Sequence, residues 1–136
     1  MSDIHPVSMI DTVMLADSNI PFIDDSQLTP IVGDDLDSAG PLLIELISLF
    51  EEENHPKLAE IREACGKRDL PALARHIHFV AGSSGNMGLQ RLSMLCRSIE
   101  KRCHQGDQTL DLDEVFASVH STFSNSLESF HARFTA

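Results

Sequence analysis

The chain has no tryptophan, no tyrosine and only seven phenylalanines among its 136 residues. A hydrophobic core must therefore be built mainly from aliphatic side chains, and 42% hydrophobic residues are enough for one globular domain. No hydrophobic run is long enough to cross a membrane, and the N-terminus lacks the basic residues that open a signal peptide. We therefore expect a cytoplasmic protein.

Basic side chains are absent from residues 1–56, which hold twelve Asp and Glu. The formal net charge is -11, and this argues against nucleic acid or an anionic membrane as a partner, because both bind to basic surfaces. All ten basic residues lie from Lys57 onward, so an anionic partner would meet them in the later part of the chain. One core accounts for the apolar residues, and we expect a monomer.

Cysteine is scarce: only Cys65, Cys96 and Cys103 are present, with no Cys-x-x-Cys spacing. An odd count without that spacing does not predict a disulfide framework, and we interpret the three as small core residues. The histidines form neither a His-x-x-x-His nor a His-Glu-x-x-His pattern. We therefore expect no metal site.

Apolar residues recur with helical spacing through most of the chain, and no segment shows the alternation of a strand. We expect an all-α fold, an antiparallel up-down four-helix bundle over residues 34–136. Residues 1–33 are expected to form an N-terminal extension with one or two short helices, which either pads the bundle or is the remnant of a linker. Short connections favour antiparallel neighbours. The helices are expected at about residues 8–16, 25–32, 37–66, 70–84, 89–104 and 111–133.

Proline and glycine predict where these helices stop or bend. Pro56 lies inside the first long helix and is expected to kink it or to split it near Glu53. Asp69 is expected to cap the helix at 70–84, and Gly106 follows the end of the helix at 89–104.

The segment that carries candidate chemistry runs from Arg75 to Gly88. On a helical wheel Ile77 faces the core, whereas Arg75, His78 and Gly82 lie together on the outer side. Gly82 leaves no side chain beside the imidazole of His78. A glycine inside a helix costs up to about 1 kcal/mol against alanine, so its presence there indicates that access to the histidine matters.

The run from His78 to Gly88 resembles the motif of histidine-phosphotransfer (HPt) domains. That motif is roughly His-x-Leu-Lys-Gly-Ser-Ser-x-x-x-Gly, and here it stands as His-Phe-Val-Ala-Gly-Ser-Ser-Gly-Asn-Met-Gly. The continuation into Leu89 and the downstream Cys96 are similar to the yeast phosphorelay intermediate protein and its relatives, and bacterial HPt modules share the motif.

The resemblance implies a carrier that relays a phosphoryl group between receiver-domain aspartates in a multistep two-component phosphorelay. His78 would be phosphorylated, Gly82 would admit the receiver, and Ser83 and Gly88 would belong to the turn that positions the helix. The implied partners are response-regulator receiver domains and a hybrid sensor histidine kinase. The receiver would supply Mg²⁺, so no cofactor and no kinase activity are expected in this chain.

One position departs from the motif: Ala81 stands where the family usually has Lys. Charge near the phosphoryl group would then come from elsewhere, with Arg75, Arg97 and His104 as candidates. Phe79 is expected to contribute to receiver docking. The alternative interpretation is a degenerate HPt-like adaptor that binds receiver or kinase domains without phosphotransfer. His76 points to the other flank and is expected to pack or to form a hydrogen bond.

Overall fold

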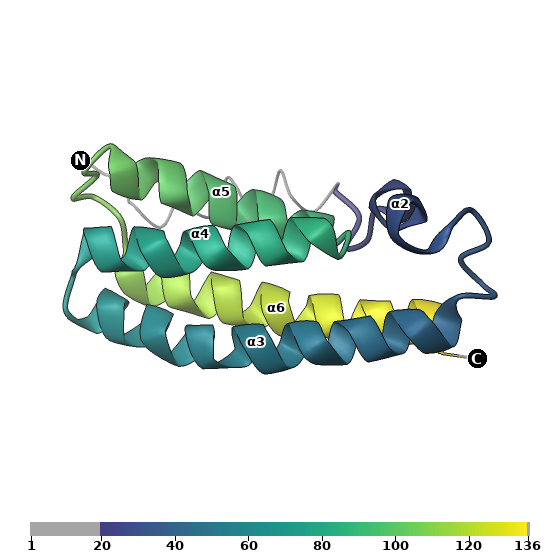
Figure 1. Cartoon of the computed structure of the whole chain (residues 1–136). Helices are drawn as coiled ribbons and strands as arrows, with labels where there is room; N and C mark the ends of the chain where they lie inside the picture. The colour runs from purple at the N-terminus through teal and green to yellow at the C-terminus, as the bar shows by residue number, and fades with distance from the viewer. Residues whose placement is uncertain (1–19, 136) are drawn as a thin grey trace.

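The computed structural model describes residues 20–135, and these residues form helices and no strand (Figure 1). A 3-10 turn and a short helix precede four long helices. The helix expected near residues 8–16 lies outside the described residues. The elements are η1 (Asp25–Gln27), α2 (Thr29–Val32), α3 (Gly40–Gly66), α4 (Leu70–Asn86), α5 (Gln90–His104) and α6 (Leu112–Phe134).

The four long helices run alternately up and down. Each packs beside its neighbour in sequence, and α6 closes the bundle against α3 (Figure 1). The short connections between the helices leave each one antiparallel to the next. The expected all-α up-down bundle is therefore confirmed. Within the described part of the chain, no helix combines the length and the apolar character needed to cross a bilayer.

Helix ends follow the local chemistry of the sequence. The Asp69 carboxylate accepts a hydrogen bond from the Ala72 backbone N–H at 3.1 Å, which caps α4 as expected. Asp111 caps α6 in the same way, at 3.1 Å from the Glu114 N–H. The backbone leaves α5 at Gly106, whose φ of +66° suits glycine.

Aliphatic side chains fill the core between the four helices, as the composition requires. Phenylalanine contributes at one layer, where the rings of Phe50 and Phe123 stack with centroids 5.8 Å apart. All three cysteines are buried and unbridged. The fully buried large side chains are Leu28, Leu43, Ile47, Ile61, Leu73, Ile77, Leu89, Leu92, Leu95, Ile99 and Phe130.

Pro56 lies inside the continuous helix α3, so a split near Glu53 is wrong and the kink, the other effect expected of this residue, stays a prediction. Proline cannot donate a helical hydrogen bond, but Phe50 and Leu58 on either side of it are both buried in the same core. Tertiary packing therefore holds both halves of α3 in one helix. Asn54 is also buried here, and its side-chain amide donates to the Phe50 carbonyl at 3.0 Å.

The segment before α3 covers the turn between α4 and α5. The Asp24 N–H donates to the Gly88 carbonyl at 2.8 Å, and Leu28 is fully buried. The Arg91 guanidinium binds the Ile20 carbonyl, with Nη2 at 2.7 Å. The described part of the extension therefore packs against one end of the bundle.

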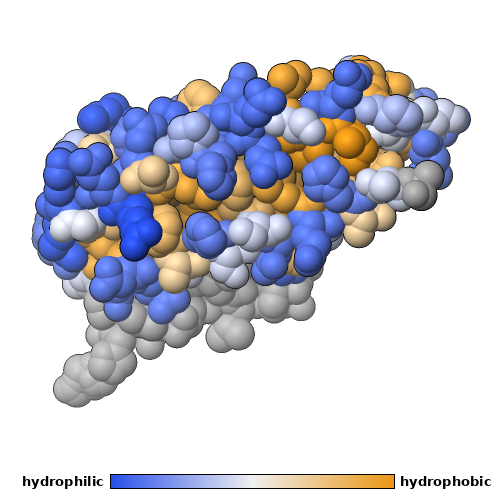
Figure 2. Space-filling model, turned by 90° about the horizontal axis from the view of Figure 1, so that it is seen from below, coloured by the Kyte–Doolittle hydropathy of each residue, from blue (hydrophilic) through white to orange (hydrophobic). Residues whose placement is uncertain are grey.

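Some hydrophobic side chains stay at the surface of α3. Leu42 and Leu49 are 46% and 55% exposed. Figure 2 shows hydrophobic surface between hydrophilic residues on the face that α3 and α6 form. The core therefore does not use the whole apolar pattern of α3.

We expect Gly88→Ala to lower the free energy of unfolding by at least about 1 kcal/mol. The φ of Gly88 is +70°, and a Cβ there would lie 2.8 Å from the Asp24 carbonyl oxygen. Chemical denaturation followed by circular dichroism measures the change. Gly66→Ala is the matched control, because open space surrounds its Cβ position. Equal losses in the two variants would contradict this account.

Candidate functional site

His78 stands on the outer face of α4, in the middle of the helix. Its side chain is 69% exposed, whereas the adjacent Ile77 and the nearby Val80 are fully buried. Because helical geometry fixes the angle between these positions, burial of the apolar residues turns the imidazole toward solvent. The helical wheel predicted this orientation.

Glu100 of α5 binds the imidazole of His78. The His78 Nδ1 and the Glu100 Oε2 are 2.8 Å apart, and the Glu100 side chain is only 17% exposed. An ionised carboxylate can only accept, so Nδ1 donates its proton to Glu100. In the neutral ring the proton then sits on Nδ1, and Nε2 keeps a free lone pair. The sequence gave no sign of this contact, because it joins side chains from two different helices.

His104, one turn further along α5, shares the same carboxylate oxygen. Its Nε2 lies 3.3 Å from the Glu100 Oε2. Both histidines are exposed and border one cavity of about 540 Å³ between α4 and α5. The structure thus brings together two of the expected site residues, His78 and His104, through their shared contact with Glu100. The cavity is lined by Pro71, Ala74, Arg75, His78, Glu100, Cys103 and His104.

Cys103 is the other nucleophilic group in this cavity. Burial, and then the charge of Glu100, raises the pKa of its thiol to about 11. At neutral pH the sulfur therefore stays protonated and weakly nucleophilic. This leaves the imidazoles of His78 and His104 as the candidate nucleophiles of the cavity.

Gly82 leaves the surface open one turn after His78. A Cβ built on Gly82 would meet nothing within 4 Å, so no contact inside the described molecule requires glycine at this position. By contrast, Ala81 is fully buried, and its carbonyl accepts a hydrogen bond from the Ser93 hydroxyl at 2.9 Å. The side chain of residue 81 therefore lies in the contact between α4 and α5, and it does not reach the surface around His78.

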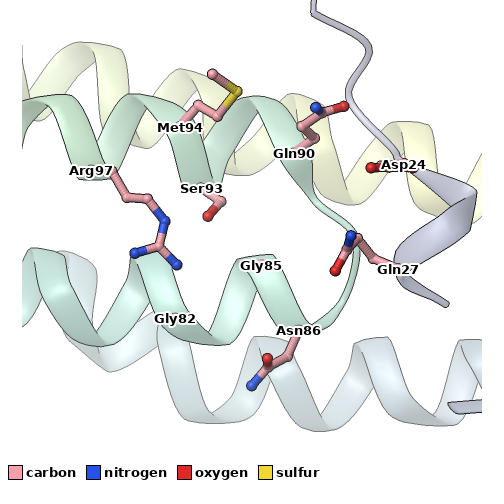
Figure 3. A pocket seen from close by; sticks show the side chains of 10 residues that line it. Asp24, Gln27, Gly82, Gly85, Asn86, Gln90, Ser93, Met94 and Arg97 are labelled. Atoms are coloured by element: carbon pink, nitrogen blue, oxygen red, sulfur yellow. The ribbon is translucent and has the colours of Figure 1, made fainter. Parts of the chain in front are cut away.

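A second cavity of about 400 Å³ begins at Gly82 and continues past Gly85 and Gly88. Arg97 points from α5 toward α4 at this place, and Asp24 and Gln27 of the N-terminal segment border its far end (Figure 3). Gly88 itself is buried beneath Asp24 and Leu28, so it shapes the turn and offers no surface to a partner. The backbones of Gly82, Gly85 and Gly88 thus line this second cavity.

The remaining expected residues lie around this site at the surface of α4. Phe79 is 40% exposed, with the Lys57 ammonium of α3 lying 4.9 Å from its ring centroid. Ser83 is half-buried on the same helix. His76 lies on the other flank, with Nδ1 at 3.8 Å from the Glu60 Oε1, as expected for a histidine that packs.

No group of three His, Cys, Asp or Glu side chains suited to a metal ion occurs within residues 20–135.

A family model for the Hpt domain matches residues 45–132 of the chain. The match covers α4 and α5 completely, and with them the His78–Glu100 pair. The chain therefore belongs to the family of histidine-phosphotransfer domains, which act as phosphocarriers. Comparisons with curated proteins and with solved structures gave no match. The more specific similarity to the yeast protein stays a prediction.

Proposed function

We propose that this protein carries a phosphoryl group on Nε2 of His78 and passes it between the aspartates of receiver domains in a multistep phosphorelay. The observation that carries the proposal is the 2.8 Å contact between His78 Nδ1 and Glu100, on an imidazole that is otherwise open to solvent. The buried face of α4 fixes the position of the helix that carries His78. The contact with Glu100 keeps Nε2, the free nitrogen of the ring, pointing away from the carboxylate.

The transfer step needs one bond to form and one to break. The Nε2 lone pair attacks the phosphorus of an aspartyl phosphate on the receiver, the P–N bond forms, and the P–O bond to the aspartate breaks. The aspartate leaves as a carboxylate. Positive charge develops on the ring as Nε2 bonds to phosphorus, and the Glu100 carboxylate stabilises it through the Nδ1 proton. Transfer to the next receiver is the reverse.

The proposed partners are response-regulator receiver domains and a hybrid sensor histidine kinase, and the receiver brings the Mg²⁺. Gly82 supports this assignment, because a glycine that no internal contact requires leaves room for another protein. The exposed ring of Phe79 offers apolar surface one residue from His78. Such signalling contacts are transient, and a small interface suffices.

The alternative function is an adaptor that binds receivers without chemistry. It accounts for the bundle and for the open surface at Gly82. It gives no reason for a half-enclosed carboxylate to orient an exposed imidazole. We therefore favour phosphotransfer, and the variants below separate the two.

Incubation with a phosphorylated receiver is expected to place a phosphate on the chain that is stable to base and labile to acid. In His78→Gln the phosphate is expected to be absent, because the amide offers no nucleophilic nitrogen. His76→Gln is the matched control and should be phosphorylated normally. Phosphate-affinity gels and intact-mass spectrometry measure the outcome. Phosphate on the His78→Gln chain, or none on the unaltered chain with any cognate receiver, would overturn the proposal.

Glu100→Gln is expected to slow transfer from a receiver by about 10-fold or more. The glutamine amide nitrogen can donate to Nδ1, and the ring proton then moves to Nε2, where it blocks the lone pair. Nitrogen NMR of the His78 ring reports the tautomer independently of the rate. Glu60→Gln, beside His76, is the control and should transfer at the unaltered rate. An unchanged rate in Glu100→Gln would show that the contact has no part in the chemistry.

We expect Gly82→Ala to keep or raise the free energy of unfolding, by up to about 1 kcal/mol, because alanine favours helix and nothing obstructs its Cβ. The same variant is expected to slow phosphoryl transfer by about 10-fold or more, since a methyl group would hold the receiver away from His78. Thermal unfolding and transfer rates measure the two effects. Normal transfer by Gly82→Ala would show that the receiver does not need a glycine at this position to reach His78.

A further inference from the structure

We propose that Arg97 of α5 supplies the cation that binds the phosphoryl group on His78, in place of the lysine that the family motif would put at position 81. The inference rests on the proposed function of His78 and adds to it a second residue, from another helix, that contacts the transferred group.

Residue 81 supplies no cation to His78 in this chain, because an alanine stands there. Ala81 is fully buried, and its carbonyl accepts a hydrogen bond from the Ser93 hydroxyl of the facing helix. A positive charge beside the phosphoryl group must therefore come from another residue.

Arg97 of α5 is placed to supply this positive charge. It lies three residues before Glu100 on α5, which is about 4.5 Å along the helix axis from the carboxylate that contacts His78. Its Nη2 is 3.7 Å from the position of a Cβ on Gly85, and Figure 3 shows its side chain reaching across toward Gly82. The glycine backbones at 82 and 85 allow a guanidinium to lie against α4.

The guanidinium of Arg97 is also available for an anion. Among the described residues no carboxylate lies within ion-pair distance of it. The residue is exposed, and a guanidinium can bind two phosphoryl oxygens at once. Arg97 borders the open surface at Gly82, where we place the receiver, so it would contact the phosphoryl group both on His78 and during transfer.

The other candidate cations are placed less favourably. Arg75 and His104 border the cavity on the opposite side of His78 from Gly82. His104 is in addition held by the Glu100 carboxylate at 3.3 Å. Arg62 of α3 serves as a comparison, because it is an exposed arginine that lies 5.6 Å from the Phe116 ring and borders neither cavity beside His78.

The test compares Arg97→Gln, Arg97→Lys and Arg62→Gln in single-turnover transfer from a phosphorylated receiver at increasing receiver concentration. Arg97→Gln is expected to lower the maximal rate by about 10-fold or more, with the half-saturating receiver concentration little changed. Arg97→Lys should recover most of that rate, and Arg62→Gln should transfer nearly as well as the unaltered chain. Phosphorus NMR of phosphorylated His78 is expected to shift in Arg97→Gln.

Three results would overturn the role of Arg97: an unchanged maximal rate in Arg97→Gln, a change confined to the half-saturating concentration, or an equal loss in Arg62→Gln. The second result would assign Arg97 to docking alone. If the unaltered chain takes no phosphate, the proposed function fails first. If the unaltered chain is phosphorylated and Arg97→Gln transfers at the same rate, only the role proposed for Arg97 is wrong.

Discussion

The close packing of α4 against α5 is the constraint on which the candidate site depends. Small side chains on the inner face of α4, such as Ala81, allow the two helices to approach, and the Ser93 hydroxyl links them through the Ala81 carbonyl. At that separation Glu100 reaches His78 across the contact. A wider separation would leave the imidazole free to rotate and to carry its proton on either nitrogen.

The same contact between α4 and α5 holds the residue at which the chain departs from the family motif, since Ala81 is buried there. Beside it, Arg97 of α5 lies over the bare backbone of Gly82 and Gly85. In our proposal this arginine, from a different helix, supplies the positive charge that the motif places at residue 81.

Glycine serves two separate purposes in this short segment. Gly88 is required by the fold, because its φ is positive and the Asp24 carbonyl lies where a Cβ would be. Gly82 is required by no internal contact, so its value lies in what it leaves accessible beside His78. Both glycines belong to the motif, and the structure gives a physical reason for the different role that the resemblance implied for each.

The sequence alone determined the four helices, the cap at Asp69 and the outward orientation of His78, because these follow from local hydrogen bonding and from the period of apolar residues along one helix. Tertiary structure alone decided the continuity of α3 through Pro56, the contact between His78 and Glu100, and the burial of Ala81. Each of these depends on the distance and rotation between two helices, and no spacing within a single helix encodes that relation.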